Sequence, residues 1–159
     1  MMILKWVLII FVTCLAIFFL WPTPAIKPQK VDYVSKIPVD KLSKIVLVYN
    51  ADADKISVLR DFFIKEFVPS DYPCNLCRIT FGTFTMKTEW KQFLDSLPLK
   101  KEFLHKDEFA KKYALAIHAF PAIFVGDENH LARLVSMEEL NAVHSLKALQ
   151  QLVLQKLTN

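Results

Sequence analysis

Cys74 and Cys77 are the residues of this chain whose type and spacing most directly indicate chemistry, because they form a Cys-Asn-Leu-Cys motif. Two thiols at this spacing can exchange a disulfide with a partner, close a structural disulfide, or share a metal ion. Arg78 follows Cys77 directly, and a neighbouring cation can lower the pKa of a thiol. The motif therefore indicates a thiol site, and the surrounding elements decide which of the three chemistries it performs.

The three chemistries make different demands on the rest of the chain. Exchange needs an accessible thiol with a lowered pKa. A structural disulfide is expected if the domain lies in an oxidising compartment, although so short a loop removes little entropy from the unfolded chain. A zinc site needs two further ligands, and the histidines stand singly at positions 105, 118, 130 and 144.

Composition and charge exclude several other classes of function. The net charge is +4, but lysines and acidic residues are interleaved along the chain, so no nucleic-acid partner is expected. The two glycines, Gly82 and Gly126, stand far apart and cannot form a glycine-rich phosphate loop. No catalytic Ser/His/Asp set is recognisable, and no bound cofactor or metal is predicted.

Residues 1–21 are predicted to be a single transmembrane anchor. An uncharged apolar run extends from Trp6 to Trp21, and tryptophan is common at both membrane interfaces. A cleaved signal peptide is the alternative, but Pro22 and Pro24 come after the run without a small-residue cleavage site. Lysines beyond the run favour a cytoplasmic domain, whereas the short N-terminal tail is typical of a signal anchor that exports the domain behind it, and we expect the extracytoplasmic side.

Residues 22–43 are predicted to be a linker rich in proline and lysine that holds the next domain away from the bilayer. Residues 44–159 then have the length and apolar content of one domain. A continuous apolar run at 45–49 predicts a central strand covered on both faces. Apolar residues recur at helical spacing over 56–67, and Asp52 or Asp54 can cap that helix or, alternatively, bind a ligand.

The rest of the domain is predicted to contain two helices between a second and a third strand, and then a hairpin and a final helix. Residues 78–84 are rich in β-branched and aromatic residues and predict the second strand. The predicted helices cover 90–97 and a shorter segment that Asp107 caps. Residues 121–125 and 131–135 predict the hairpin. Ser136 and Glu139 form a capping box that begins the last helix, whose apolar stripe runs from position 140 to 157.

This order of elements, βαβαββα, resembles the thioredoxin-like fold from about residue 44 to the C-terminus. The C-terminal half carries most of the resemblance: Lys111-Lys112-Tyr113 ends a short helix, Ala119-Phe120-Pro121-Ala122-Ile123-Phe124-Val125 leads into a strand, and a hairpin and a helix come next. The resemblance implies an α/β fold, with a mixed sheet flanked by helices. It also implies that Pro121 is the cis-proline of the family, although an ordinary trans proline at the start of an edge strand is the alternative.

The resemblance implies a thiol-disulfide oxidoreductase in which Cys74, as the more exposed thiol, attacks a disulfide of a protein partner and Cys77 resolves the mixed disulfide. The position of the motif departs from the family, because in active thioredoxins it directly follows the first strand and opens the next helix. Here residues 50–54 occupy that position, and the cysteines would precede a second strand at the end of the sheet opposite Pro121. The rival hypothesis is a non-catalytic binding or assembly module with structural cysteines.

Overall fold

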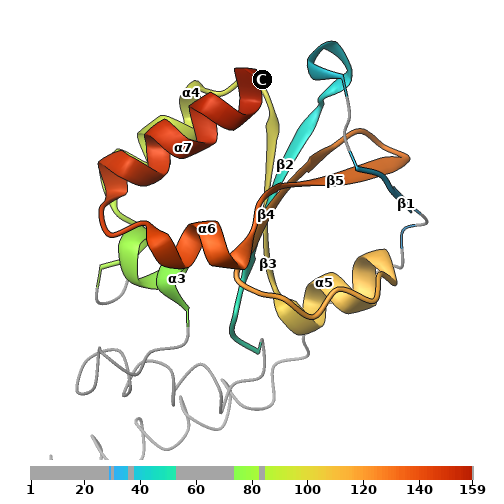
Figure 1. Ribbon diagram of the computed structural model, residues 1–159, viewed down its shortest axis with the longest axis horizontal. Helices are drawn as coiled ribbons and strands as arrows, with labels where there is room; N and C mark the ends of the chain where they lie inside the picture. Colours follow the sequence, from blue (N-terminus) through green and yellow to red (C-terminus); the bar gives the residue numbers. More distant parts are fainter. Residues whose placement is uncertain (1–28, 30, 36–37, 53–73, 83–84, 159) are drawn as a thin grey trace, which may run out of the picture.

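The computed structural model describes residues 29, 31–35, 38–52, 74–82 and 85–158. These residues form an α/β domain in which helices flank a mixed five-stranded sheet (Figure 1). The proposed anchor at 1–21 and the predicted helix at 56–67 lie outside the described residues. Among the residues that are described, no helix is long and apolar enough to cross a membrane.

The sheet has the strand order β1-β5-β4-β2-β3. The strands are β1 (Asp32–Tyr33), β2 (Lys44–Tyr49), β3 (Lys100–His105), β4 (Ala122–Gly126) and β5 (His130–Val135). β2 pairs with β3 in parallel and with β4 in antiparallel register, and β5 pairs antiparallel to β4 and parallel to β1. Every residue of β2 is buried, which confirms the predicted central strand.

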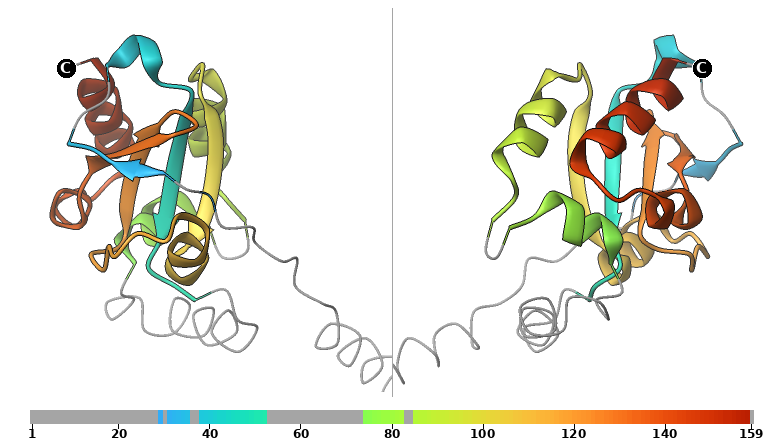
Figure 2. Two further views of the ribbon diagram at one scale, coloured as in Figure 1. Left: turned by 90° about the vertical axis from the view of Figure 1, so that its right-hand side faces the viewer. Right: turned by 60° about the vertical axis from the view of Figure 1, so that its left-hand side comes forward.

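Helices cover the two faces of the sheet unequally (Figures 1 and 2). One face carries α3 (Asn75–Thr80), α4 (Thr88–Ser96), α6 (Met137–Ala142) and α7 (Leu146–Thr158), and the other carries α5 (Lys106–Tyr113). Alternation along β2 divides its side chains between two hydrophobic clusters. Ile45, Leu47 and Tyr49 join the first cluster, under α3, α4, α6 and α7, whereas Val46 and Val48 join the second cluster, under α5.

The predicted strand at 78–84 is wrong, because residues 75–80 form α3 and Gly82 already lies beyond it. Strand propensity at Ile79 and Thr80 amounts to a few tenths of a kcal/mol per residue, which burial readily overrides. Both side chains are buried in α3. The Thr80 hydroxyl also donates a hydrogen bond to the Leu76 carbonyl oxygen at 2.7 Å, which satisfies its polar group inside the helix.

The strand that pairs in parallel with β2 is β3, at 100–105, which the sequence pattern did not reveal. Its sequence, Lys-Lys-Glu-Phe-Leu-His, lacks β-branched residues. The side chain of Lys101 donates a hydrogen bond from Nζ to the Leu97 carbonyl oxygen at 2.8 Å. As an edge strand, β3 is only partly buried, so it carries little of the apolar signal that identified β2. The helices α3 and α4 therefore both lie between the two parallel strands in the chain.

The C-terminal half follows the predicted order with two changes. The β4–β5 hairpin is confirmed, as is the capping box, in which Ser136 N–H donates to Glu139 Oε2 at 2.9 Å. The predicted single last helix is divided, because α6 ends at Ala142 and α7 begins at Leu146. The Ser145 hydroxyl accepts a hydrogen bond from Ala148 N–H at 3.2 Å and so begins the second helix.

Two smaller differences concern the start of α5 and the predicted linker. His105, rather than Asp107, is the N-cap of α5, and its backbone N–H bonds Glu108 Oε2 at 2.8 Å. Asp32–Tyr33, within the segment predicted to be a linker, forms β1 and pairs with β5. The chain before residue 44 therefore contributes an edge strand to the sheet.

Candidate functional site

Cys74 and Cys77 are joined in a disulfide at the start of α3, with an S–S distance of 2.13 Å. Cys74 is the N-cap of this helix, and its Sγ accepts a hydrogen bond from Cys77 N–H at 3.3 Å. The Cys74 carbonyl oxygen accepts from Arg78 N–H at 3.1 Å, which is the first helical hydrogen bond. The motif therefore opens a helix, and Cys74 Sγ satisfies one of the backbone donors that a helix leaves unpaired at its first turn.

Both cysteines are buried, which changes the expected order of exposure. The exposed fraction is 0% for Cys74 and 7% for Cys77, so the expectation that Cys74 is the more exposed thiol is wrong. The physical reason is that both side chains, with those of Leu76 and Ile79, pack into the first hydrophobic cluster. In this arrangement the disulfide presents little surface to an attacking thiol.

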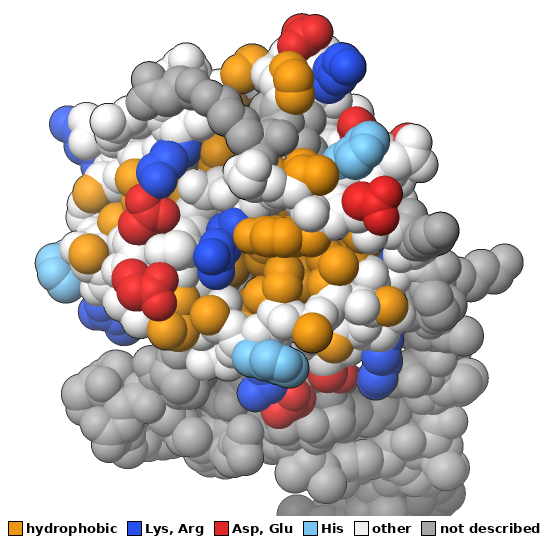
Figure 3. Space-filling view, turned by 45° about the vertical axis from the view of Figure 1, so that its right-hand side comes forward, with side chains coloured by type: hydrophobic (Ala, Val, Ile, Leu, Met, Phe, Trp, Pro, Cys, Tyr) orange, Lys and Arg blue, Asp and Glu red, His pale blue; other side chains and the backbone are white. Residues whose placement is uncertain are grey.

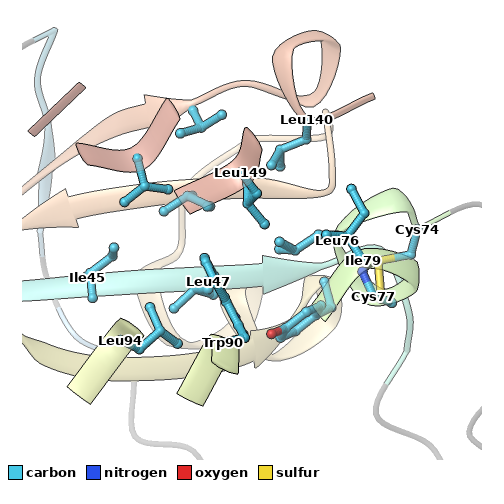
Figure 4. Packing of buried hydrophobic residues seen from close by; sticks show 14 of the residues in the cluster. Ile45, Leu47, Cys74, Leu76, Cys77, Ile79, Trp90, Leu94, Leu140 and Leu149 are labelled. Atoms are coloured by element: carbon cyan, nitrogen blue, oxygen red, sulfur yellow. Dashed lines mark hydrogen bonds between the residues drawn. A yellow bond between two sulfur atoms is a disulfide. The ribbon is translucent and has the colours of Figure 1, made fainter. Parts of the chain in front are cut away.

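The disulfide lies at the end of the sheet where β2 finishes, which corrects the predicted placement at the opposite end from Pro121. Figure 4 shows Cys74 and Cys77 beyond the tip of the β2 arrow, while Ile45 lies toward its tail. Tyr49, the last residue of β2, packs its ring edge-on against Phe81, at 5.6 Å between ring centroids, directly after α3. The prediction failed because it rested on a strand that begins at residue 78, whereas residues 75–80 form α3.

Pro121 precedes β4 at this same end of the sheet. Its neighbour Ala122 pairs with Val48, one residue before the end of β2. The Phe120–Pro121 peptide bond is cis, which confirms the expectation drawn from the family resemblance. The structure therefore brings the cysteine pair and the cis-proline to one end of the sheet.

Asn75, between the two cysteines, is a polar residue of this region that the sequence reasoning did not single out. It is 8% exposed, and its Nδ2 donates to the carbonyl oxygens of Leu140 at 2.5 Å and Val143 at 2.8 Å. Its Oδ1 accepts from Arg78 Nε at 3.0 Å and Nη2 at 2.5 Å. The guanidinium of Arg78 is therefore bonded to Asn75, and the only sequence signal for Asn75 was its place inside the motif.

Two buried polar atoms lie in the cluster beside α3. The hydroxyl of Tyr49 and Nε1 of Trp90 have no hydrogen-bond partner within the described part of the chain. Burial, with the neighbouring Thr80 and Trp90 acting in the opposite direction, raises the pKa of Tyr49 well above its ordinary value. The ring of Trp90 also stacks on Phe93, with 5.2 Å between ring centroids, so these aromatic residues belong to the core.

Charged residues follow the parallel strands at the cysteine end of the sheet. Asp52 Oδ2 lies 3.4 Å from Lys106 Nζ, and His105 Nδ1 lies 2.9 Å from Glu108 Oε2. Asp52 was predicted to cap the helix at 56–67, which lies outside the described residues. Asp54, the other predicted cap, lies outside them as well. No group of three or more His, Cys, Asp or Glu in the described ranges is placed to hold a metal ion.

A second polar cluster lies on the other face of the sheet, under α5. Tyr113 OH donates to Glu102 Oε2 at 2.6 Å, and Lys112 forms an ion pair with Glu102. Lys44 Nζ lies 5.1 Å from the centroid of the Tyr113 ring. Burial lowers the pKa of Lys44, while Glu102 acts against that shift. This cluster joins the end of α5 to β2 and β3, away from the disulfide.

The face of the molecule that carries α5 and β1 is apolar at its centre. Figure 3 shows hydrophobic side chains gathered there, with charged side chains around them. Leu115 and Ile117, in the segment that follows α5, pack partly buried against the second cluster. This face lies across the sheet from α3, so the disulfide is not part of it.

Comparison with protein-family models, with curated proteins and with solved structures found no match for this chain. The candidate site is therefore defined by its own geometry. It consists of a buried disulfide at the N-terminus of a short helix, at the sheet end that also holds a cis-proline.

Proposed function

We propose that this chain is a membrane-tethered thioredoxin-like protein that exchanges disulfides with a protein partner through Cys74 and Cys77. The arrangement of elements supports the proposal: the cysteine motif opens a helix between two parallel strands, and a cis-proline leads into an antiparallel hairpin and the final helices. Residues 1–21 would anchor the protein and residues 44–159 would lie on the extracytoplasmic side. Residues 50–73, between β2 and the motif, are the main departure from an active thioredoxin.

The hydrogen bond from Cys77 N–H to Cys74 Sγ is the observation that carries the proposal. In the reduced protein, such a donor favours the thiolate over the thiol and lowers the pKa of Cys74. The Cys74 thiolate would attack a disulfide of the partner, forming a mixed disulfide and releasing one partner thiolate. The Cys77 thiolate would then attack Cys74 Sγ, so that two electrons pass to the partner, which leaves as a dithiol.

Burial of both sulfur atoms favours a second candidate, a non-catalytic thioredoxin-like binding or assembly module. With exposed fractions of 0% and 7%, the disulfide resembles a structural crosslink of the hydrophobic core. In such a module, Cys74→Ser would lower stability without removing an exchange activity. A protein without disulfide exchange would also show a reduction potential typical of a structural disulfide.

The two candidates differ in the reduction potential of the Cys74–Cys77 pair and in the pKa of Cys74. We expect a potential above about −300 mV and a Cys74 pKa below about 8.5. Equilibration of the full-length protein with thiol buffers of known potential measures the first quantity. The pH dependence of alkylation of Cys74 in a Cys77→Ser variant measures the second. A potential below about −300 mV together with an unshifted pKa would favour the structural module.

A further inference from the structure

Asn75 ties the cysteine-bearing helix to the corner between α6 and α7. Its side-chain amide donates to the carbonyl oxygens of Leu140 and Val143, at 2.5 Å and 2.8 Å, and α3 packs against α6. The Leu140 carbonyl lies in the last turn of α6, where it also accepts from Val143 N–H at 3.3 Å, and the Val143 carbonyl belongs to the C-cap residue of the helix. One buried side chain therefore satisfies acceptors on an element 65 and 68 residues further along the chain.

Asn75 lies between Cys74 and Cys77 in the sequence. While its side chain stays bonded to Leu140 and Val143, the first turn of α3 is held in the core. Cys74 is 0% exposed, and Leu76, also at 0%, anchors the same turn. A thiol must approach a disulfide along the S–S axis to react with it. The first turn of α3 must therefore separate from α6 before either sulfur is attacked, and both Asn75 hydrogen bonds must break in that separation.

We infer that Asn75 is a positioning residue that gates the reactivity of the Cys74–Cys77 disulfide by holding α3 against the α6–α7 corner. The inference deepens the proposed function and rests on it, because a gate has a role only if the disulfide exchanges. In the open form, a thiolate of the reductant attacks Cys74 Sγ, the S–S bond breaks and Cys77 leaves as a thiolate, which is the proposed exchange in the reverse direction. A dithiol reductant then closes its own disulfide and supplies the two electrons.

Two substitutions at this position separate the α6 hydrogen bonds from the bonds to Arg78. Asn75→Ala removes both sets. Asn75→Asp keeps the shape of the side chain and an oxygen for Arg78, but it replaces the donor with an oxygen that faces two carbonyl oxygens. If the bonds to α6 form the gate, both variants open it.

A matched control lowers stability without contact with α3. Phe109 is fully buried in the second cluster, on the other face of the sheet, and stacks on Phe124 at 4.9 Å between ring centroids. Phe109→Leu leaves the Asn75 bonds in place. Any acceleration that this variant shows reports general loosening rather than the gate.

The experiment measures how fast dithiothreitol reduces the disulfide in the oxidised full-length protein, held in nonionic detergent micelles. Reaction samples are quenched with a maleimide, and the modified thiols are counted by mass. We expect Asn75→Ala and Asn75→Asp to be reduced about tenfold faster than the wild type or more. Phe109→Leu should differ from the wild type by less than about twofold, because local opening of α3 leaves the second cluster folded.

A measurement on the wild type tests the gate even if the Asn75 variants fail to fold. Opening of α3 alone exposes less surface than global unfolding, so the reduction rate should depend on urea more weakly than the global unfolding equilibrium does. The rate should also level off at high dithiothreitol concentration, when attack becomes faster than closing. A urea dependence equal to that of global unfolding would overturn the inference.

Equal reduction rates in Asn75→Ala and Phe109→Leu would also overturn it. Failure of the gate and failure of the proposed function have different signatures. A reduction potential below about −300 mV would contradict the proposed disulfide exchange, whatever the reduction rates of the variants are. A potential above about −300 mV, with reduction rates that the Asn75 substitutions leave unchanged, would contradict only the role of Asn75.

Discussion

Tyr49 shows how one residue joins the central strand to the candidate site. It ends β2, its ring contacts Phe81 after α3, and its hydroxyl lies buried without a hydrogen-bond partner in the described residues. A buried hydroxyl without a partner costs about 1–3 kcal/mol of stability. Tyr49 therefore contributes an apolar ring to the core at the expense of an unsatisfied polar atom.

Replacement of Tyr49 by phenylalanine should raise the free energy of unfolding at neutral pH. It should also reduce the loss of stability at alkaline pH. Burial raises the pKa of Tyr49, whereas in the unfolded chain a tyrosine ionises at about pH 10. The wild type therefore loses stability above about pH 10, by at most about 1.4 kcal/mol per pH unit for this one group. Tyr49→Phe should gain about 1 kcal/mol near pH 7 and lose less above pH 10.

Urea unfolding of both proteins between about pH 7 and pH 11 measures this difference. Tyr113 provides the internal comparison, since burial raises its pKa too and the group is present in both proteins. Some alkaline loss of stability should therefore persist in the variant. An unchanged slope above pH 10 would show that the Tyr49 hydroxyl ionises normally in the folded protein.

At the scale of elements, the β4–β5 hairpin depends on a turn that several groups hold closed. Asp127 Oδ1 accepts from Asn129 N–H and His130 N–H, both at 2.7 Å. The Asn129 bond is the main cause that lowers the pKa of Asp127 to about 2, and His130 adds to the shift. Gly126, just before the turn, lies against the His130 carbonyl oxygen. The backbone of the two strands approaches so closely there that a side chain has no room.

Gly126→Ala should destabilise the protein, by about 2 kcal/mol or more, because its methyl group would overlap the His130 carbonyl oxygen and approach Leu131. Gly82→Ala is the matched control, since its methyl group would make an ordinary contact of 3.6 Å with the Thr85 carbonyl oxygen. We expect the control to lie within about 1 kcal/mol of the wild type. Urea midpoints of the two variants give the comparison, and equal midpoints would show that the hairpin adjusts freely.

On the scale of the whole molecule, one sheet carries a hydrophobic cluster on each of its two faces. The second cluster has only α5 as its helical cover among the described residues, and Phe109 lies at its centre, in contact with the rings of Phe120, Phe124 and Tyr113. Since alternate residues of β2 serve each cluster, loss of packing on the α5 face should weaken the strand that also supports α3. The two faces are therefore expected to unfold together.

Phe109→Ala should cost about 3–5 kcal/mol, because it leaves a cavity among buried aromatic rings. Phe103→Ala is the control, as Phe103 is 42% exposed on the edge strand β3 and should cost less than about 1 kcal/mol. Urea unfolding followed by both far-UV circular dichroism and the fluorescence of Trp90, which is buried in the first cluster, checks the coupling in proteins that carry phenylalanine at positions 6 and 21. Separate midpoints for the two probes in Phe109→Ala would show that the faces unfold independently.

Strong local patterns predicted much of this molecule. The apolar run at 45–49 identified the central strand, the runs at 121–125 and 131–135 identified the hairpin, and Ser136 with Glu139 identified a capping box. These predictions hold because each depends on residues that are neighbours in the sequence. The edge strand β3 escaped prediction because its pairing with β2, and not its composition, makes it a strand.

The sequence by itself determined that two thiols stand at an exchangeable spacing and that a proline leads into a hairpin. Only the tertiary structure decided that they lie at the same end of the sheet, because that placement depends on α3 being a helix between β2 and β3. Burial of both sulfur atoms, and the bonds from Asn75 to α6, are likewise tertiary facts. They join residues more than sixty positions apart, and no local pattern records such a contact.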